Sequence, residues 1–133
     1  MGFSSLLQSK AAHEALLSRQ DAELRLLETM RRCITSKVKC DKDYALALAS
    51  ISGQGQKAQD RAEDLTGSLV AQAWKGMMEE LDSTSKLLKN NAETVEKDTL
   101  EKLNTLCQEK RKARKQYLEE HNRITQHFSN VST

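Results

Sequence analysis

Five of six consecutive positions in the last third of the chain carry cationic side chains. They are Lys110, Arg111, Lys112, Arg114 and Lys115, within the stretch CQEKRKARKQY at residues 107–117. Cations at this density attract anions, so the run could meet an anionic membrane or a nucleic acid, or could be an ordinary solvated helix face. The whole chain carries a formal charge of only +2. The excess is therefore local, which suits a contact face better than a generally basic nucleic-acid binder.

Other residue types that carry out chemistry do not form a recognisable site. The cysteines are Cys33, Cys40 and Cys107, and the histidines are His13, His121 and His127. No Cys-x-x-Cys pair occurs and the histidines do not join the cysteines at metal-ligand spacing, so no metal or other cofactor is predicted. We expect reduced thiols, buried or half-buried. No paired carboxylates or nucleophile constellation occurs either, so the chain is not predicted to be an enzyme.

The elements that must position these residues are helices. The 133 residues include no proline and five glycines, 30% are charged and 4% are aromatic. Leu, Ala, Glu, Lys, Gln and Arg dominate, as in long helices. The composition predicts an all-α fold, an elongated antiparallel helical bundle resembling a coiled coil.

The first predicted helix covers residues 13–51, with a short separate turn at residues 3–7. Its apolar residues recur at intervals near three and four, the spacing of a helix-packing seam. The predicted seam consists of Leu17, Leu24, Leu27, Met30, Ile34, Val38, Ala45, Leu48 and Ile51. Gly53 and Gly55 then predict a loop between helices at residues 52–57.

The second predicted helix covers residues 60–96. Its seam consists of Leu65, Leu69, Val70, Ala73, Trp74, Met77, Leu81, Leu88 and Val95. Trp74 is predicted to be a buried anchor of this seam. Poor helix formers in NNAETVEKDT predict a bend or short break at residues 90–99.

The third predicted helix begins at Thr99, a plausible N-cap. Its seam consists of Leu100, Leu103, Cys107, Tyr117, Ile124 and Phe128. The heptad continuation places Lys110 and Arg114 on this seam, so the seam becomes polar where the cations lie. The sequence thus predicts that this position tolerates or favours charge.

Several motifs resemble the N-terminal F-BAR region of the Fes/Fer (Fps) cytoplasmic tyrosine kinases. The most specific are ELRLLE at residues 23–28, KCDKDYA at residues 39–45 and ARKQY at residues 113–117. The resemblance implies one partial F-BAR domain over residues 1–133, with an FCH segment at 1–89 and the start of a long coiled-coil extension at 90–133. An F-BAR domain is longer than this chain, so a fragment or short isoform is expected.

The resemblance also implies a function. F-BAR domains form antiparallel homodimers whose cationic face binds phosphatidylserine and phosphoinositides. Arg114 and Lys115 match a basic pair of Fes-like members, and Lys110, Arg111 and Lys112 lie beside it. Lys37 and Lys39 in the first helix are further candidates for lipid contact.

The implied location is cytoplasmic and peripheral to a membrane, with no nucleic-acid partner predicted. No Gly-rich loop, His-Arg-Asp or Asp-Phe-Gly motif of a kinase occurs in the sequence. An oligomerisation scaffold that does not contact lipid is the alternative function.

Overall fold

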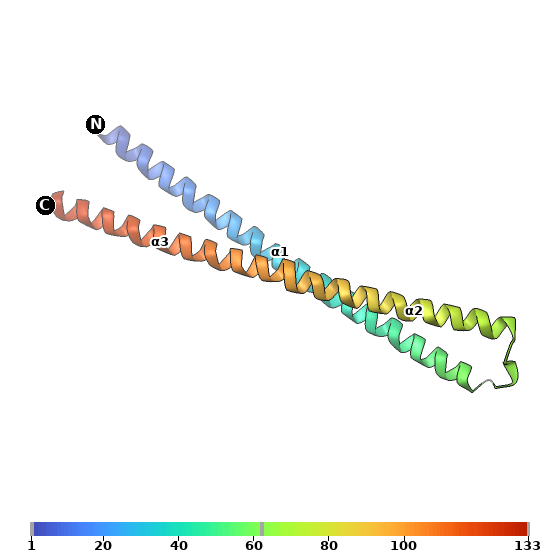
Figure 1. Ribbon diagram of the computed structural model, residues 1–133. Helices are drawn as coiled ribbons and strands as arrows, with labels where there is room; N and C mark the ends of the chain where they lie inside the picture. Colours follow the sequence, from blue (N-terminus) through green and yellow to red (C-terminus); the bar gives the residue numbers. More distant parts are fainter. Residues whose placement is uncertain (1, 62, 133) are drawn as a thin grey trace. The chain divides into compact units, whose positions relative to one another are not determined.

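A computed structural model describes residues 2–61 and 63–132, with the side chains of 63 and 129–132 left out of the description. The elements follow the order α1 (Phe3–Asp60), the 3₁₀-helix η1 (Glu63–Leu65), α2 (Leu69–Thr94), the π-helix η2 (Val95–Leu100) and α3 (Glu101–Ser132) (Figure 1). The described residues contain helices and no strand, which confirms the all-α prediction. Across these residues, no helix is both long and apolar enough to cross a bilayer.

The chain divides into two compact units, each described by itself. Residues 33–100 form the hairpin unit, which contains the second half of α1, η1, α2 and η2. Residues 1–32 and 101–133 form the terminal unit, which contains the first half of α1 and all of α3. Within each unit the two helical stretches run antiparallel, because residues early in one stretch contact residues late in the other.

The core of the hairpin unit is a narrow seam of mostly small residues. Buried positions on α1 are Val38, Ala45, Leu48, Ser52 and Gly55, and those on α2 are Met78, Ser85 and Ala92. Met78, Ser85 and Ala92 are spaced by seven, as in a coiled coil. The Ser52 hydroxyl donates to the Met78 carbonyl oxygen at 2.9 Å, and the Ser85 hydroxyl donates to the Ala45 carbonyl oxygen at 2.7 Å. Small side chains let the helices approach closely enough for these bonds.

The predicted loop at residues 52–57 is wrong, because α1 continues through both glycines to Asp60. A glycine inside a helix costs about 1 kcal/mol of stability relative to alanine. At Gly55 the packing against α2 leaves no room for a larger residue. A Cβ atom there would lie 2.1 Å from the Met78 sulfur. The chain reverses instead around Gly67, which has a φ of +83° that other residues rarely adopt. The separate turn predicted at residues 3–7 is also wrong, since α1 begins at Phe3.

The predicted seam on α2 is right for Leu81, Leu88 and Val95, which are half-buried, and wrong at Met77, whose place is taken by the next residue. Met78 is 2% exposed, whereas Met77 is 55% exposed. Trp74 is 41% exposed and its indole N–H donates to the Gly55 carbonyl oxygen at 3.1 Å. It therefore lies at the edge of the seam, and its prediction as a buried anchor is wrong. On α1 the prediction holds for Val38, Ala45 and Leu48, which are buried, but Met30 and Ile51 are exposed.

The bend or short break predicted at residues 90–99 coincides with the π-helix η2, a local change of helix type that does not interrupt the helix. Buried residues are spaced by seven up to Ala92, and the next, Leu100, follows after eight. A π-turn accommodates one additional residue, so η2 keeps Leu100 in the core cluster with Val38 and Ala92. The predicted N-cap at Thr99 is wrong: α3 follows η2 directly at Glu101, so the helix does not start afresh there.

Candidate functional site

The cationic run Lys110, Arg111, Lys112, Arg114 and Lys115 lies on α3 within the terminal unit. Ahead of it, Leu103 and Cys107 are buried. Behind it, Tyr117 is half-buried, while Ile124 and Phe128 are exposed. The predicted third seam is thus buried in its first part only. Arg114 is half-buried and the other four cations are exposed.

Three cations of the run form ion pairs with carboxylates of α1. Lys110 Nζ lies 3.5 Å from Glu23 Oε2, Arg111 pairs with Glu28, and Arg114 pairs with Asp21. These partners are 83 to 93 residues apart in the chain. Antiparallel pairing of α1 with α3 brings them together, and it explains how the seam accommodates charge.

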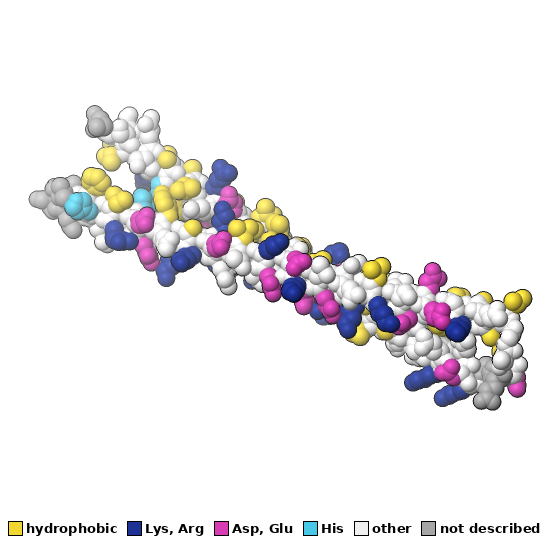
Figure 2. Space-filling view, in the orientation of Figure 1, with side chains coloured by type: hydrophobic (Ala, Val, Ile, Leu, Met, Phe, Trp, Pro, Cys, Tyr) yellow, Lys and Arg dark blue, Asp and Glu magenta, His cyan; other side chains and the backbone are white. Residues whose placement is uncertain are grey.

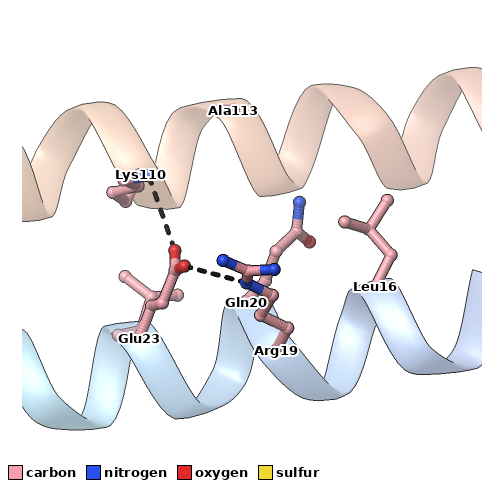
Figure 3. A pocket seen from close by; sticks show the side chains of 7 residues that line it. Leu16, Arg19, Gln20, Glu23, Lys110 and Ala113 are labelled. Carbon is pink, nitrogen blue, oxygen red and sulfur yellow. Dashed lines mark hydrogen bonds and ion pairs between the residues drawn. The ribbon is translucent and has the colours of Figure 1, made fainter.

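The Glu23 carboxylate interacts with one cation of α1 and one of α3. It accepts from Arg19 Nε at 3.4 Å, one turn earlier on α1. Figure 3 shows Lys110 and Glu23 directed toward one another, with Arg19 beside the same carboxylate. Leu16, Gln20, Leu24 and Ala113 complete the lining of this pocket.

The pairing of Glu28 with Arg111 has an electrostatic consequence. The hydrogen bond from the Arg111 guanidinium and its charge hold the pKa of the Glu28 carboxyl below its usual value of 4.5. Arg31 and Arg32 lower this pKa further through their charges. Glu28 is therefore anionic at neutral pH and remains a counter-ion for Arg111.

The other two cations of the run point to a different role. Lys112 and Lys115 are exposed, and within the described part of the chain neither forms an ion pair with a carboxylate. Lys115 lines an open groove with Arg25, Arg111, Arg114, Asp21, Leu24, Glu28 and Leu118. The Arg114 Nε atom is buried and has no hydrogen-bond partner among the described residues. Among the described residues of the run, Lys112 and Lys115 thus remain available to an external anion, whereas the unpaired Arg114 Nε donor is out of contact with solvent.

Lys37 and Lys39 belong to the hairpin unit rather than to the terminal unit that holds the run. Each is exposed and pairs one turn along α1: Lys37 with Asp41 at 2.8 Å and Lys39 with Asp43 at 3.2 Å. Such pairs are typical of a solvated helix face. Their proposed part in lipid contact remains a prediction.

An aromatic cluster in the terminal unit was not anticipated from the sequence. The His13 Nδ1 atom and the Tyr117 hydroxyl are 2.7 Å apart, and the His13 and His121 rings stack with centroids separated by 3.6 Å. Only the pairing of α1 with α3 could have indicated it. Among the described residues, no group of three or more His, Cys, Asp or Glu side chains could hold a metal ion.

The thiols differ from one another. Cys107 is buried, whereas Cys33 and Cys40 are exposed, and all three are free. The prediction of buried or half-buried thiols is therefore correct for Cys107 alone. Helix geometry at residues 33 and 40 directs these two side chains away from the seam.

Charge is unevenly divided between the two units. The terminal unit contains twelve Lys and Arg residues and eight Asp and Glu residues, a net charge of +4. The hairpin unit contains nine and eleven, a net charge of −2. On the face that Figure 2 shows, cations are interspersed with acidic side chains. The positive excess is a property of the terminal unit.

Comparison with known proteins identifies the family. Residues 12–90 match the FCH family, described as the Fes/CIP4, and EFC/F-BAR homology domain. The chain is 33% identical over 124 residues to tyrosine-protein kinase Fer of Homo sapiens. The aligned residues make up 93% of this chain and 15% of Fer. It is also 31% identical over 133 residues to the tyrosine-protein kinase transforming protein Fps of Fujinami sarcoma virus. That alignment covers 97% of this chain and 15% of Fps.

The chain therefore spans about 15% of the length of these relatives. No solved structure matches it. The matched segment, residues 12–90, is an FCH segment and not a kinase domain. The resemblance to the Fes/Fer family is confirmed, and the chain belongs to the FCH/F-BAR family of membrane-binding and dimerisation modules.

Proposed function

We propose that this chain docks on anionic membranes that contain phosphatidylserine or phosphoinositides, as a peripheral protein of the cytoplasmic face. Arg114 and Lys115 are the centre of the contact, and Lys110, Arg111 and Lys112 support it. The observation that carries the proposal is the density of five cations in six positions on α3 of a chain from the F-BAR family.

The proposed docking is weak and reversible. A cation near an anionic leaflet contributes about 1 kcal/mol. Lys112 and Lys115 are exposed and have no carboxylate partner among the described residues, so each can contribute this in full. The three cations already paired with α1 contribute less, because a lipid phosphate must replace a carboxylate. Lys37 and Lys39 are proposed as additional contacts.

Dimerisation would strengthen such weak docking. We propose that two copies of the chain associate through apolar side chains that the described structure leaves exposed. The large side chains more than 65% exposed are Phe3, Leu6, Leu46, Leu69, Val70 and Phe128. Two linked cationic runs bind one membrane more tightly than two separate chains, through effective concentration.

Vesicle pelleting tests the lipid contact. The double variant Arg114→Gln, Lys115→Gln should bind vesicles containing phosphatidylserine and a phosphoinositide several-fold more weakly than the parent chain. Binding of the parent should fall steeply with salt, since the Debye length shortens from about 10 Å at 0.1 M to about 3 Å at 1 M. Vesicles of phosphatidylcholine alone should bind neither protein.

A matched control separates a local effect from a general loss of charge. Lys57→Gln with Lys75→Gln removes the same charge from exposed positions in the acidic hairpin unit and should leave binding unchanged. Helicity and oligomeric state are compared for all three proteins. Equal vesicle binding by the parent and the Arg114/Lys115 variant would show that the run is a solvated face and would refute the proposal. No vesicle binding by the parent would favour the lipid-independent scaffold, and tighter binding to DNA at matched salt would favour a nucleic-acid contact.

A further inference from the structure

The carboxylates opposite the cationic run form a set of their own. Asp21, Glu23 and Glu28 lie within eight residues of α1, and each pairs with a different cation of α3. We refer to them as the counter-ion set. Since each partner cation belongs to the proposed lipid contact, the counter-ion set and the membrane require the same donors.

We propose that the counter-ion set competes with anionic lipid for Lys110, Arg111 and Arg114, and so restrains membrane docking. In the free chain these three cations are neutralised, and docking begins at Lys112 and Lys115. This inference rests on the proposed function and adds its regulation: the paired cations engage lipid only by exchanging a carboxylate for a phosphate.

The exposure of the pairs makes this exchange feasible. The six side chains that form them are between 30% and 48% exposed. Ion pairs in contact with solvent are weakly held, so a surface dense in phosphate can displace the carboxylates. Each displaced carboxylate is also left near a surface of its own charge. The counter-ion set therefore opposes docking both by occupying the donors and by repulsion.

The proposal predicts that membrane binding has a threshold in the anionic lipid content of the membrane. At low anionic lipid content only Lys112 and Lys115 engage, and binding is weak. As the anionic content rises, the surface outcompetes the carboxylates and more cations join the contact. Binding should therefore rise more steeply with anionic content in the parent chain than in a chain without the counter-ion set.

The test neutralises the counter-ion set in the whole chain. The triple variant Asp21→Asn, Glu23→Gln, Glu28→Gln should reach half-saturation on phosphatidylcholine vesicles containing phosphatidylserine at a lipid concentration about fivefold lower than the parent. The control triple Glu14→Gln, Glu119→Gln, Glu120→Gln changes the net charge equally, at exposed positions of the same unit. It should alter binding by less than about twofold.

The outcomes separate the two proposals. If the parent binds and the counter-ion variant binds no better than the control triple, the inference is overturned and the proposed function stands. If only the counter-ion variant binds, the inference is supported in its strongest form. If none of the three proteins binds, both proposals are overturned.

A double-mutant cycle of Glu28 and Arg111 tests the same inference if the triple variant loses helicity. Glu28→Gln alone should tighten binding, and Arg111→Gln should weaken binding more in the Glu28→Gln background than in the parent, because Arg111 is then free to meet lipid. Strictly additive effects of the two substitutions on vesicle binding would overturn the inference, whatever the triple variant does.

Discussion

At the scale of single residues, Gly55 lies where α1 and α2 come so close together that a side chain would not fit. A Cβ atom at this position would lie 2.1 Å from Met78 Sδ, 2.8 Å from Met78 Cγ and 3.3 Å from Trp74 Cζ2. Met78 is 2% exposed, so it cannot move aside without disturbing the seam. Gly55→Ala should therefore lower the free energy of unfolding by about 1–3 kcal/mol, measured by chemical denaturation.

Gly53 provides the control for this substitution. It lies in the same helix two residues earlier, and a Cβ atom there would meet nothing within 4 Å. Gly53→Ala should raise the free energy of unfolding by about 1 kcal/mol, because alanine is the better helix former. If both alanine variants were stabilising, α1 and α2 would not be as close at Gly55 as the structure shows.

At the scale of elements, the start of α2 depends on one side chain. The Ser68 hydroxyl accepts from the backbone N–H groups of Val70 at 3.2 Å and Ala71 at 3.4 Å, as an N-cap. Ser68→Ala leaves these donors without a protein partner and should cost about 1 kcal/mol of stability. Thermal unfolding followed by circular dichroism measures this cost.

The conservative variant Ser68→Asp checks that the cap is the cause. An aspartate retains the acceptor and places negative charge at a helix N-terminus, which is favourable. Its stability should match that of the parent within a few tenths of a kcal/mol. Equal losses in the Ala and Asp variants would show that another property of Ser68 matters.

At the scale of the whole molecule, the described structure leaves many large apolar side chains in contact with water. Leu69 is 82% exposed and Phe3 is 77% exposed. Burial of such surface drives association, so the chain should sediment as a dimer at micromolar concentration. Because the contact is apolar, added salt should not dissociate it, in contrast to vesicle binding. A folded, strictly monomeric chain would contradict the proposed dimer.

Several properties of this protein follow from sequence alone, since they depend on composition and local pattern. The absence of proline and the scarcity of aromatics indicated helices, and poor helix formers marked the region where the helix changes to the π-helix η2. The motifs ELRLLE, KCDKDYA and ARKQY indicated the family. The density of cations on α3 was visible without any structure. The division into an FCH segment at 1–89 and an extension at 90–133 remains a prediction.

Tertiary structure decided which residues face one another. Apolar periodicity does not separate Met77 from Met78, because either fits a stripe, and only packing against α1 selects Met78. The helix crosses Gly53 and Gly55 because a close interhelical contact at Gly55 offsets glycine's poor propensity. The carboxylate partners of Lys110, Arg111 and Arg114 lie 83 to 93 residues away. Local pattern cannot specify such pairs, since they depend on the register of two antiparallel helices.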